Sequence, residues 1–244
     1  MKMTGNAILI TGGTSGIGLG FAERFLGSGN RVIICGRRTE RLAEIKAKHP
    51  QVETFACDVT DERQRAQLRD WAVSRFPELN VLVNNAGIQH ATDLTQPVDL
   101  QRVRQEIETN LVAPIHLASL FAGQLASRPA AAVINVSSAL AYTPLALMPV
   151  YCATKAAVHS LTLSLRRQFR DTSVRVFEII PPSVDSELGR DHWTAEQQSH
   201  GGMPVAAFID GAMQALESDT FEAPIDMARG LWEKRDALFD RMNL

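Results

Sequence analysis

Tyr151 and Lys155 are the residues of this chain whose types and spacing point most directly to chemistry. They stand four positions apart in PVYCATKAAVHSLTLSL, which begins at Pro149 and otherwise contains mostly small and apolar residues. In a helix this spacing places both side chains on one face, one above the other. An ammonium group beside a phenol favours the phenolate, so the pair could exchange a proton with a bound ligand. A polar pair on a helix suited to burial therefore needs an explanation other than packing.

A glycine-rich stretch, TGGTSGIG (11–18), follows the apolar run AILIT (7–11) near the N-terminus. Its glycines permit a tight turn and let a pyrophosphate approach backbone N–H groups where a helix begins. The spacing is G-x-x-x-G-x-G, which differs from the usual G-x-G-x-x-G, and a purely structural turn is the alternative. We expect cofactor contacts from Gly12, Thr14, Ser15, Gly16, Ile17 and Gly18.

The end of the second apolar run, CGRRTERL, indicates which dinucleotide would bind. An NAD site has an Asp or Glu here to bind the ribose hydroxyls, whereas this chain has Gly36 followed by Arg37 and Arg38. A guanidinium can clamp a 2′-phosphate through two hydrogen bonds. The pattern therefore favours NADP(H) over NAD(H). Arg37 is the stronger candidate for this contact, since Arg38 is alternatively a solvated charge at a helix entry.

The elements that must position these residues follow an alternating pattern. Short runs rich in β-branched residues alternate with longer segments of helical spacing; the runs are AILIT (7–11), RVIIC (31–35), VETFAC (52–57), NVLVN (80–84), AAVINV (131–136) and VRVFEII (174–180). This pattern indicates parallel strands covered on both faces. We expect one α/β domain over residues 1–244, a Rossmann-type doubly wound parallel sheet with ligands beyond the carboxyl ends of the strands.

The segment 186–220 is predicted to be a substrate lid within this domain. Its first part, SELGRDHWTAEQQSHGGMP (186–204), is polar, contains glycine and is too long for an ordinary connection. His192 and Trp193 lie in it, and a catalytic role for His192 is disfavoured.

Four motifs, taken together, resemble the short-chain dehydrogenase/reductase family: TGGTSGIG, NNAG (84–87), INVSS (134–138) and YCATK (151–155). They cover the chain from about residue 7 to 186. The resemblance implies that Tyr151 is the general acid/base and that Lys155 binds the nicotinamide ribose. It also implies that Ser138, thirteen residues before Tyr151, holds the substrate carbonyl oxygen, and that the main-chain carbonyl of Asn110 binds a relay water. The ammonium and the positively charged nicotinamide would together lower the pKa of Tyr151 from about 10.

The residue four positions after Asn110 also bears on the Asn110 carbonyl. In a helix the carbonyl of residue 110 accepts the N–H of residue 114, but residue 114 is proline and has none. The Asn110 carbonyl is therefore expected to be free, with a bend in the helix. An ordinary proline kink beside a solvated asparagine is the alternative.

The family resemblance implies further cofactor contacts at matching positions: Asp58, Val59, Asn85, Ala86, Gly87, Pro181, Val184 and Ser186. Asn85 is alternatively structural. The family usually has Pro-Gly-x-Val-x-Thr where this chain has PPSVDS (181–186), and Pro182 excludes a positive-φ turn there. This loop and the ending FDRMN resemble a group of uncharacterised bacterial oxidoreductases named for the D-alanyl-lipoteichoic-acid operon, a likeness that implies no substrate.

Composition restricts the partners and the compartment. The net charge of −2 gives no reason to expect nucleic acid or an anionic membrane as a partner, and no apolar run approaches the length of a membrane span. The three cysteines show no metal-type spacing, so we expect reduced, largely buried thiols in a cytoplasmic protein without a metal site. The helices at about 103–126 and 151–169 favour a homodimer, with a tetramer as the alternative.

The connection from Ser138 to Tyr151, ALAYTPLALMPV (139–150), suggests an apolar pocket wall that includes Leu140, Tyr142 and Leu145. His159 is expected to be a packed or surface histidine. These features predict an NADP(H)-dependent oxidoreductase that acts on a small to medium, partly apolar ketone or secondary alcohol. The alternative is a non-catalytic NADPH-binding redox sensor, which would not need all four catalytic residues.

Overall fold

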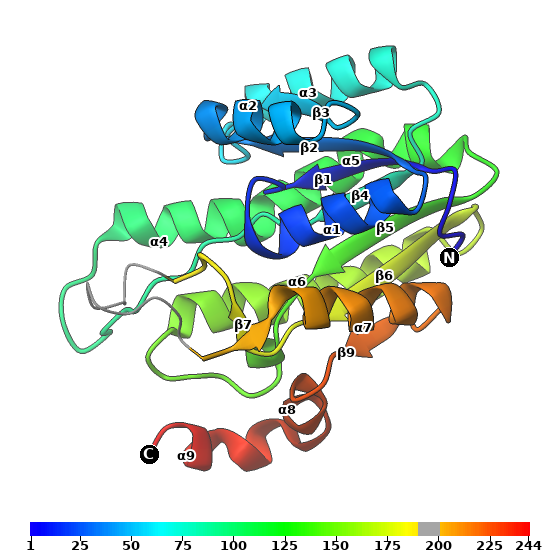
Figure 1. Cartoon of the computed structure of the whole chain (residues 1–244). Helices are drawn as coiled ribbons and strands as arrows, with labels where there is room; N and C mark the ends of the chain where they lie inside the picture. The colour runs from blue at the N-terminus through cyan, green and yellow to red at the C-terminus, as the bar shows by residue number, and fades with distance from the viewer. Residues whose placement is uncertain (190–200) are drawn as a thin grey trace.

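The computed structural model describes residues 1–189 and 201–244 and contains a central sheet of seven parallel strands (Figure 1). The strand order is β3-β2-β1-β4-β5-β6-β9. The strands are β1 Ala7–Thr11, β2 Arg31–Gly36, β3 Glu53–Ala56, β4 Val81–Asn84, β5 Ala131–Val136, β6 Val174–Ile180 and β9 Glu222–Pro224. Two short strands, β7 Val184–Asp185 and β8 Met203–Pro204, pair with each other outside this sheet.

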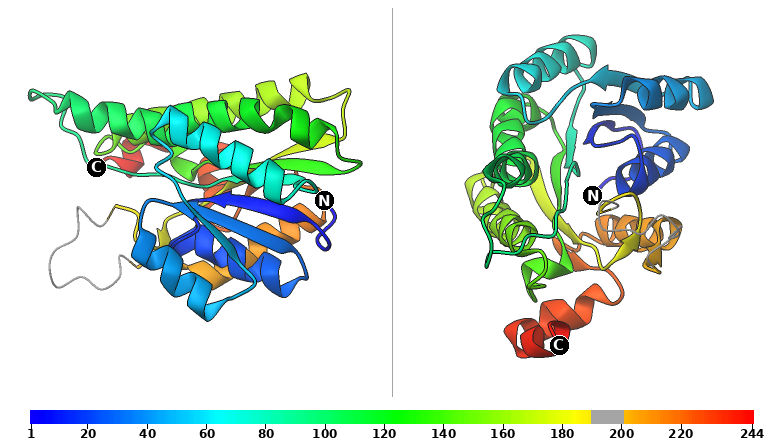
Figure 2. Two further views of the ribbon diagram at one scale, coloured as in Figure 1. Left: turned by 90° about the horizontal axis from the view of Figure 1, so that it is seen from above. Right: turned by 90° about the vertical axis from the view of Figure 1, so that its left-hand side faces the viewer.

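Helices cover both faces of the sheet, as expected for a doubly wound fold (Figure 2). One core joins the sheet to α1 Gly16–Gly27, α2 Thr39–Lys48 and α7 Val205–Glu217. The other core joins it to α3 Glu62–Arg75, α5 Ala113–Ala126 and α6 Pro149–Gln168. The strands contribute apolar side chains to both cores, which explains their continuous apolar runs.

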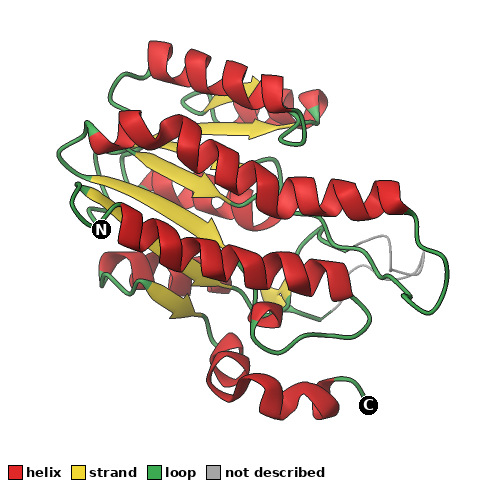
Figure 3. Ribbon diagram, turned by 180° about the vertical axis from the view of Figure 1, so that it is seen from behind, coloured by secondary structure: helices red, strands yellow, loops and turns green. Residues whose placement is uncertain are grey.

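The remaining helices lie around the ends of the strands. Helix α4 Leu100–Ile107 runs into α5 through a π-helical segment, Glu108–Val112. A single 3₁₀ turn, Ala139–Ala141, follows β5. The C-terminal helices α8 Ala228–Lys234 and α9 Phe239–Met242 lie beyond the β9 edge of the sheet (Figure 3). None of the helices in the described part of the chain is long and apolar enough to cross a membrane.

The six strands predicted from the sequence are all present, within one residue or so of the predicted ends. Strand β9 was not predicted, because three residues ending in proline give too short an apolar pattern, and a proline is tolerated at a sheet edge. The three cysteines are free and buried, as predicted.

The predicted lid segment, 186–220, is only partly described. Residues 205–217 form α7, which packs Phe208, Ile209 and Ala212 into the core against α1. Residues 190–200, including His192 and Trp193, lie outside the described residues. The lid over 186–220 therefore stays a prediction.

Candidate active site

Tyr151 and Lys155 lie on the buried face of α6, only 4% and 5% exposed. The Lys155 ammonium donates to the Val136 carbonyl at the end of β5 (2.9 Å), and its Nζ lies 5.6 Å from the centre of the Tyr151 ring. Burial lowers the pKa of Lys155 to about 8. Burial also raises the pKa of Tyr151, against the opposing effect of a hydrogen bond with Ser138. In the protein alone burial therefore outweighs the Ser138 hydrogen bond, and Tyr151 keeps its proton.

Ser138 stands where β5 ends and the 3₁₀ turn begins. Its hydroxyl accepts the backbone N–H of Leu140 (3.1 Å), and its proximity to the phenol acts to lower the pKa of Tyr151. The preceding serine, Ser137, is fully buried, and its Oγ has no hydrogen-bond partner among the described residues. The structure thus brings Ser138, and not Ser137, to Tyr151.

Asn110 lies in the π-helical segment, where the regular helical pattern is interrupted as Pro114 predicts. Its side chain accepts the N–H of Ile88 (2.9 Å) and donates to the Ile88 carbonyl (2.8 Å) and to Thr154 Oγ1 on α6 (3.1 Å). These bonds tie the helix to the loop after β4 and to the helix that carries Tyr151. A Cβ on Gly87 would lie 3.5 Å from Asn110 Oδ1 and 3.6 Å from Lys155 Nζ, so the backbone of this loop runs past both.

The glycine-rich turn packs too closely for side chains. Gly12 has a φ of +65°, and a Cβ there would lie 2.9 Å from the Ala86 Cα. A Cβ on Gly18 would lie 2.3 Å from the Gly12 carbonyl oxygen. Asn85 Nδ2 donates to the Thr11 carbonyl (2.9 Å), which ties the loop after β4 to this turn.

A cavity of about 360 Å³ opens where α1 begins. Its lining comes from the glycine turn, α1, α2, the segment after β6 and the start of α7: Thr14, Ser15, Gly16, Leu19, Arg41, Asp185, Ser186, Glu187 and Val205. Backbone N–H groups at a helix start, without side chains in front of them, fit the phosphates of a dinucleotide. Ile17 packs against the core below this cavity.

The two arginines after β2 differ in their contacts. Arg38 Nη2 donates to Thr14 Oγ1 (3.1 Å) and Ser15 Oγ (2.8 Å), so its guanidinium lies against the glycine turn. Arg37 Nη1 lies 3.9 Å from Asp58 Oδ2, at the carboxyl end of the neighbouring strand β3. Arg38, the weaker candidate from the sequence, is the arginine that contacts the predicted phosphate-binding turn.

The PPSVDS segment contacts both the catalytic turn and the glycine turn. The Pro181 carbonyl accepts the N–H of Ala139 (2.9 Å). Val184 is buried in β7, and Ser186 lies so close to the glycine turn that a Cβ on Gly16 would be 3.0 Å from the Ser186 Cβ. Pro182 therefore does not prevent this segment from reaching the cavity. Val59 is buried on the other side, next to Asp58.

Glu106 is a buried carboxyl that the sequence analysis missed. It is on α4, one helical turn before Asn110, and accepts the N–H of His90 (3.2 Å). Burial raises its pKa to about 7, although the His90 hydrogen bond and the Arg102 charge act in the opposite direction. Its charge also raises the pKa of Tyr151, which places it in the electrostatic environment of the site. Glu106 could have been recognised in the sequence because it lies four residues before Asn110, on the same face of the helix.

Tyr142 does not line an apolar pocket, so that expectation is wrong. Its hydroxyl lies 2.8 Å from His159 Nδ1 and 3.1 Å from oxygens of Glu178 and Glu222. The His159 ring nitrogen also lies 2.8 Å from Glu178, and this bond raises the pKa of His159. Trp232 Nε1 donates to Glu222 (2.5 Å). A glutamate inside the apolar strand run VRVFEII was the available signal for this cluster.

Ligand atoms of His159, Glu178 and Glu222 lie within 4.8 Å of one another, a grouping that could hold a metal ion. The indole, phenol and imidazole of the cluster already supply N–H and O–H donors to the two carboxylates. These donors satisfy the carboxylates, and we assign no metal to this cluster.

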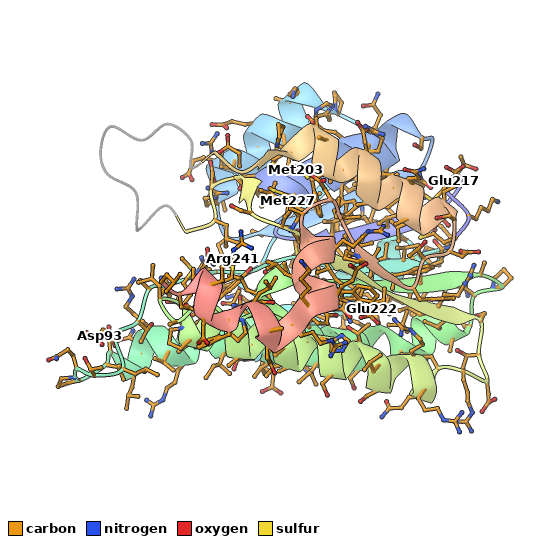
Figure 4. The ribbon with its side chains drawn as sticks, turned by 90° about the horizontal axis from the view of Figure 1, so that it is seen from below. Asp93, Met203, Glu217, Glu222, Met227 and Arg241 are labelled. Atoms are coloured by element: carbon orange, nitrogen blue, oxygen red, sulfur yellow. The ribbon has the colours of Figure 1, made fainter. Side chains whose placement is uncertain are left out.

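A larger cavity of about 960 Å³ lies near the start of α6, and its lining includes Leu140, Leu145, Cys152, Ala156 and Phe239. Cys152 and Ala156 are on a different face of α6 from Tyr151 and Lys155. Seen from below, the C-terminal segment that carries Arg241 covers this side of the molecule, and Asp93 lies at the outer end of the loop after β4 (Figure 4).

A doubly wound parallel sheet, a glycine-lined cavity at the first helix and a buried Ser-Tyr-Lys group define a nicotinamide-dinucleotide oxidoreductase. The family model for short chain dehydrogenases matches residues 6–197, and the chain belongs to the short-chain dehydrogenase/reductase family. It is an oxidoreductase with an NAD(P)-binding fold that acts on CH–OH groups.

Known proteins similar to this chain include one that matches it over its whole length. An uncharacterized oxidoreductase DltE of Bacillus subtilis is 46% identical over 248 aligned positions, which cover 100% of this chain and 98% of that protein. Serine 3-dehydrogenase of Rhizobium radiobacter is 34% identical, with 74% and 73% covered. A short chain dehydrogenase from Burkholderia cenocepacia, solved in complex with NADP, has a TM-score of 0.85 and 28% identity, with 99% of each chain covered.

Proposed function

We propose that this protein is an NADP(H)-dependent oxidoreductase that interconverts a ketone and a secondary alcohol. The observation that carries the proposal is that Ser138, Tyr151 and Lys155 are buried together at the end of β5: Ser138 acts on the pKa of Tyr151, and the Lys155 ammonium is held by the Val136 carbonyl. These groups lie at the carboxyl ends of the central strands, on the same edge as the glycine-lined cavity. In a doubly wound sheet this edge is where a dinucleotide and its substrate meet.

NADP(H) is proposed over NAD(H) because β2 ends at Gly36 and not at a carboxylate. Arg38 contacts the glycine turn, and Arg37 lies 3.9 Å from Asp58, just after β3. A guanidinium at this place can hold a 2′-phosphate with two hydrogen bonds. A similar protein from Burkholderia cenocepacia was solved with NADP, which supports this choice.

Each catalytic residue has a proposed role that its surroundings support. The bound nicotinamide would supply or accept the hydride. The Ser138 hydroxyl holds the substrate oxygen, and the Tyr151 hydroxyl donates a proton to that oxygen during reduction. Lys155 binds the nicotinamide ribose and stabilises the phenolate that remains. The Asn110 carbonyl holds a water that returns the proton, since Pro114 cannot donate a hydrogen bond to it.

We propose a partly apolar substrate of small to medium size. The loop 139–148 connects Ser138 to α6 and presents Leu140 and Leu145 to a cavity. We also propose a cytoplasmic homodimer: Ile115 on α5 and Leu163 on α6 are each 44% exposed, and free buried cysteines suit a reducing compartment.

The test combines cofactor binding with turnover. Fluorescence titration with NADPH and NADH is expected to show tighter binding of NADPH, and a panel of ketones with NADPH should identify a substrate. Tyr151→Phe is expected to abolish turnover and leave NADPH binding nearly unchanged. Full turnover by this variant would refute the assigned role. NADPH binding without turnover of any ketone or alcohol, together with a partner protein bound in one redox state only, would favour a redox sensor.

A further inference from the structure

Glu187 places a carboxylate at the edge of the proposed nucleotide cavity. Its Oε2 lies 2.6 Å from Arg38 Nη1, and its Oε1 lies 3.9 Å from Arg41 Nη2. The side chain is 27% exposed and lines the cavity together with Ser15 and Ser186. The segment that carries Glu187 follows β7, far along the chain from the glycine turn.

Arg38 is occupied on two sides by this arrangement. Its Nη2 donates to Thr14 and Ser15, and its Nη1 donates to Glu187. A guanidinium binds a phosphate best when two parallel N–H groups point at it. Here one of the two terminal nitrogens already points at a carboxylate, so an incoming 2′-phosphate must share Arg38 with Glu187 or displace it.

Glu187 also offers a carboxylate in place of the one that β2 lacks at its end. An NAD-binding sheet supplies an Asp or Glu from the end of β2 to accept the ribose 2′-hydroxyl, whereas β2 of this chain ends at Gly36. Glu187 brings a carboxylate to the same edge of the cavity from a different element. A ribose hydroxyl can donate to a carboxylate, but a 2′-phosphate carries negative charge and is repelled by it.

We propose that Glu187 is a specificity-determining residue that competes with the 2′-phosphate for Arg38. It weakens binding of NADP(H) and leaves binding of NAD(H) unchanged or slightly improved. The preference for NADP(H) is then set by the balance of Arg38 against Glu187 and not by the arginine alone. This inference rests on the proposed nicotinamide-dinucleotide site.

The test compares the binding of two nucleotides that differ in the 2′-phosphate, 2′,5′-ADP and 5′-AMP, by isothermal titration calorimetry. Glu187→Gln removes the charge and keeps the shape of the side chain. It is expected to tighten 2′,5′-ADP binding about two- to five-fold at low ionic strength, the range of a partly exposed ion pair, and to leave 5′-AMP binding unchanged. The gain should shrink in 0.5 M salt, because the pair is accessible to ions.

Glu44→Gln is the matched control. Glu44 is on the same side of the molecule and pairs with Arg41 at 3.1 Å, so it makes the same charge change without a contact to Arg38. It is expected to alter 2′,5′-ADP binding by much less than Glu187→Gln. An equal gain from both variants would show a general charge effect and would overturn the inference.

The competition itself is tested in an Arg38→Leu background. If Glu187 acts by occupying Arg38, the added Glu187→Gln change should give little gain there. An undiminished gain would refute competition. If the wild type prefers 2′,5′-ADP but Glu187→Gln has no effect, this inference fails and the proposed function stands. If the wild type binds neither nucleotide, the proposed function fails.

Discussion

Replacing Lys155 by methionine is expected to abolish turnover and at the same time to make the folded protein more stable at pH 7. The reason is that the ammonium is almost fully buried, and burial lowers its pKa from an ordinary 10.5 to about 8. At pH 7 the group is therefore charged in an environment that disfavours the charge. The difference between these pKa values corresponds to about 3 kcal/mol.

The loss of one hydrogen bond opposes this gain. Lys155 donates to the Val136 carbonyl, and leaving that acceptor unpaired costs about 1–2 kcal/mol. Methionine keeps most of the apolar contacts of the lysine stem. The net effect is about 1–2 kcal/mol of added stability, which raises the Tm by roughly 2–8 °C for a protein of this size.

The pH dependence gives the sharper assay. Between pH 8 and 10.5 the unfolded chain binds more protons at Lys155 than the folded protein does, so wild-type stability rises with pH through this interval. The methionine variant lacks this pH-dependent contribution to stability. Thermal or urea unfolding of both proteins should therefore show the variant's advantage shrinking from pH 8 to 10. A variant that is less stable at pH 7, or an advantage that stays constant, would refute the reasoning.

Three further predictions test other parts of the site. Gly18→Ala places a carbon 2.3 Å from a backbone oxygen, so it is expected to abolish NADPH binding, whereas Gly27→Ala on the same helix meets nothing within 4 Å and should be neutral or stabilising by up to about 1 kcal/mol. His159→Gln should cost the most stability below pH 6.5 and progressively less as pH rises through the raised pKa of His159, because the protonated ring is the form that Glu178 stabilises; urea unfolding at a series of pH values measures this. Asn110→Ala removes three hydrogen bonds of a buried side chain and is expected to cost about 2–4 kcal/mol in thermal unfolding; a loss below 1 kcal/mol would contradict the contacts of its side chain.

The strands and the shared buried face of Tyr151 and Lys155 were predictable because both depend on local pattern. A strand covered on both faces must be apolar along its length, and six such runs are visible in the sequence. Tyr151 and Lys155 need only the helical repeat to share a face. The interruption near Asn110 follows from a proline that has no N–H to donate. The structure places a π-helical segment there, just before α5.

The misjudged residues depend on contacts between distant segments. Tyr142 looks like part of an apolar wall because its neighbours are apolar, but its hydroxyl reaches glutamates on β6 and β9. Arg38 looks like a surface charge from its position before α2, yet it folds back onto Ser15. Glu187 stands far from both in the sequence. Local sequence periodicity does not predict these long-range contacts, because they are set by the order of the strands in the sheet.

The polar residues of α6 can be understood as one row. Tyr151, Lys155, His159 and Thr162 share a face, and each meets a different partner: Ser138, the Val136 carbonyl, Glu178 and Asn135 in turn. A helix that packs on the sheet through such a row must satisfy every polar group or lose stability. His159 and Thr162 do so through their hydrogen bonds with Glu178 and Asn135. Tyr151 and Lys155 lie near the carboxyl ends of the strands. There burial lowers the pKa of Lys155, and Tyr151 keeps its proton. The same packing that makes the row costly to bury therefore leaves a protonated phenol and an ammonium beside Ser138 at the end of β5.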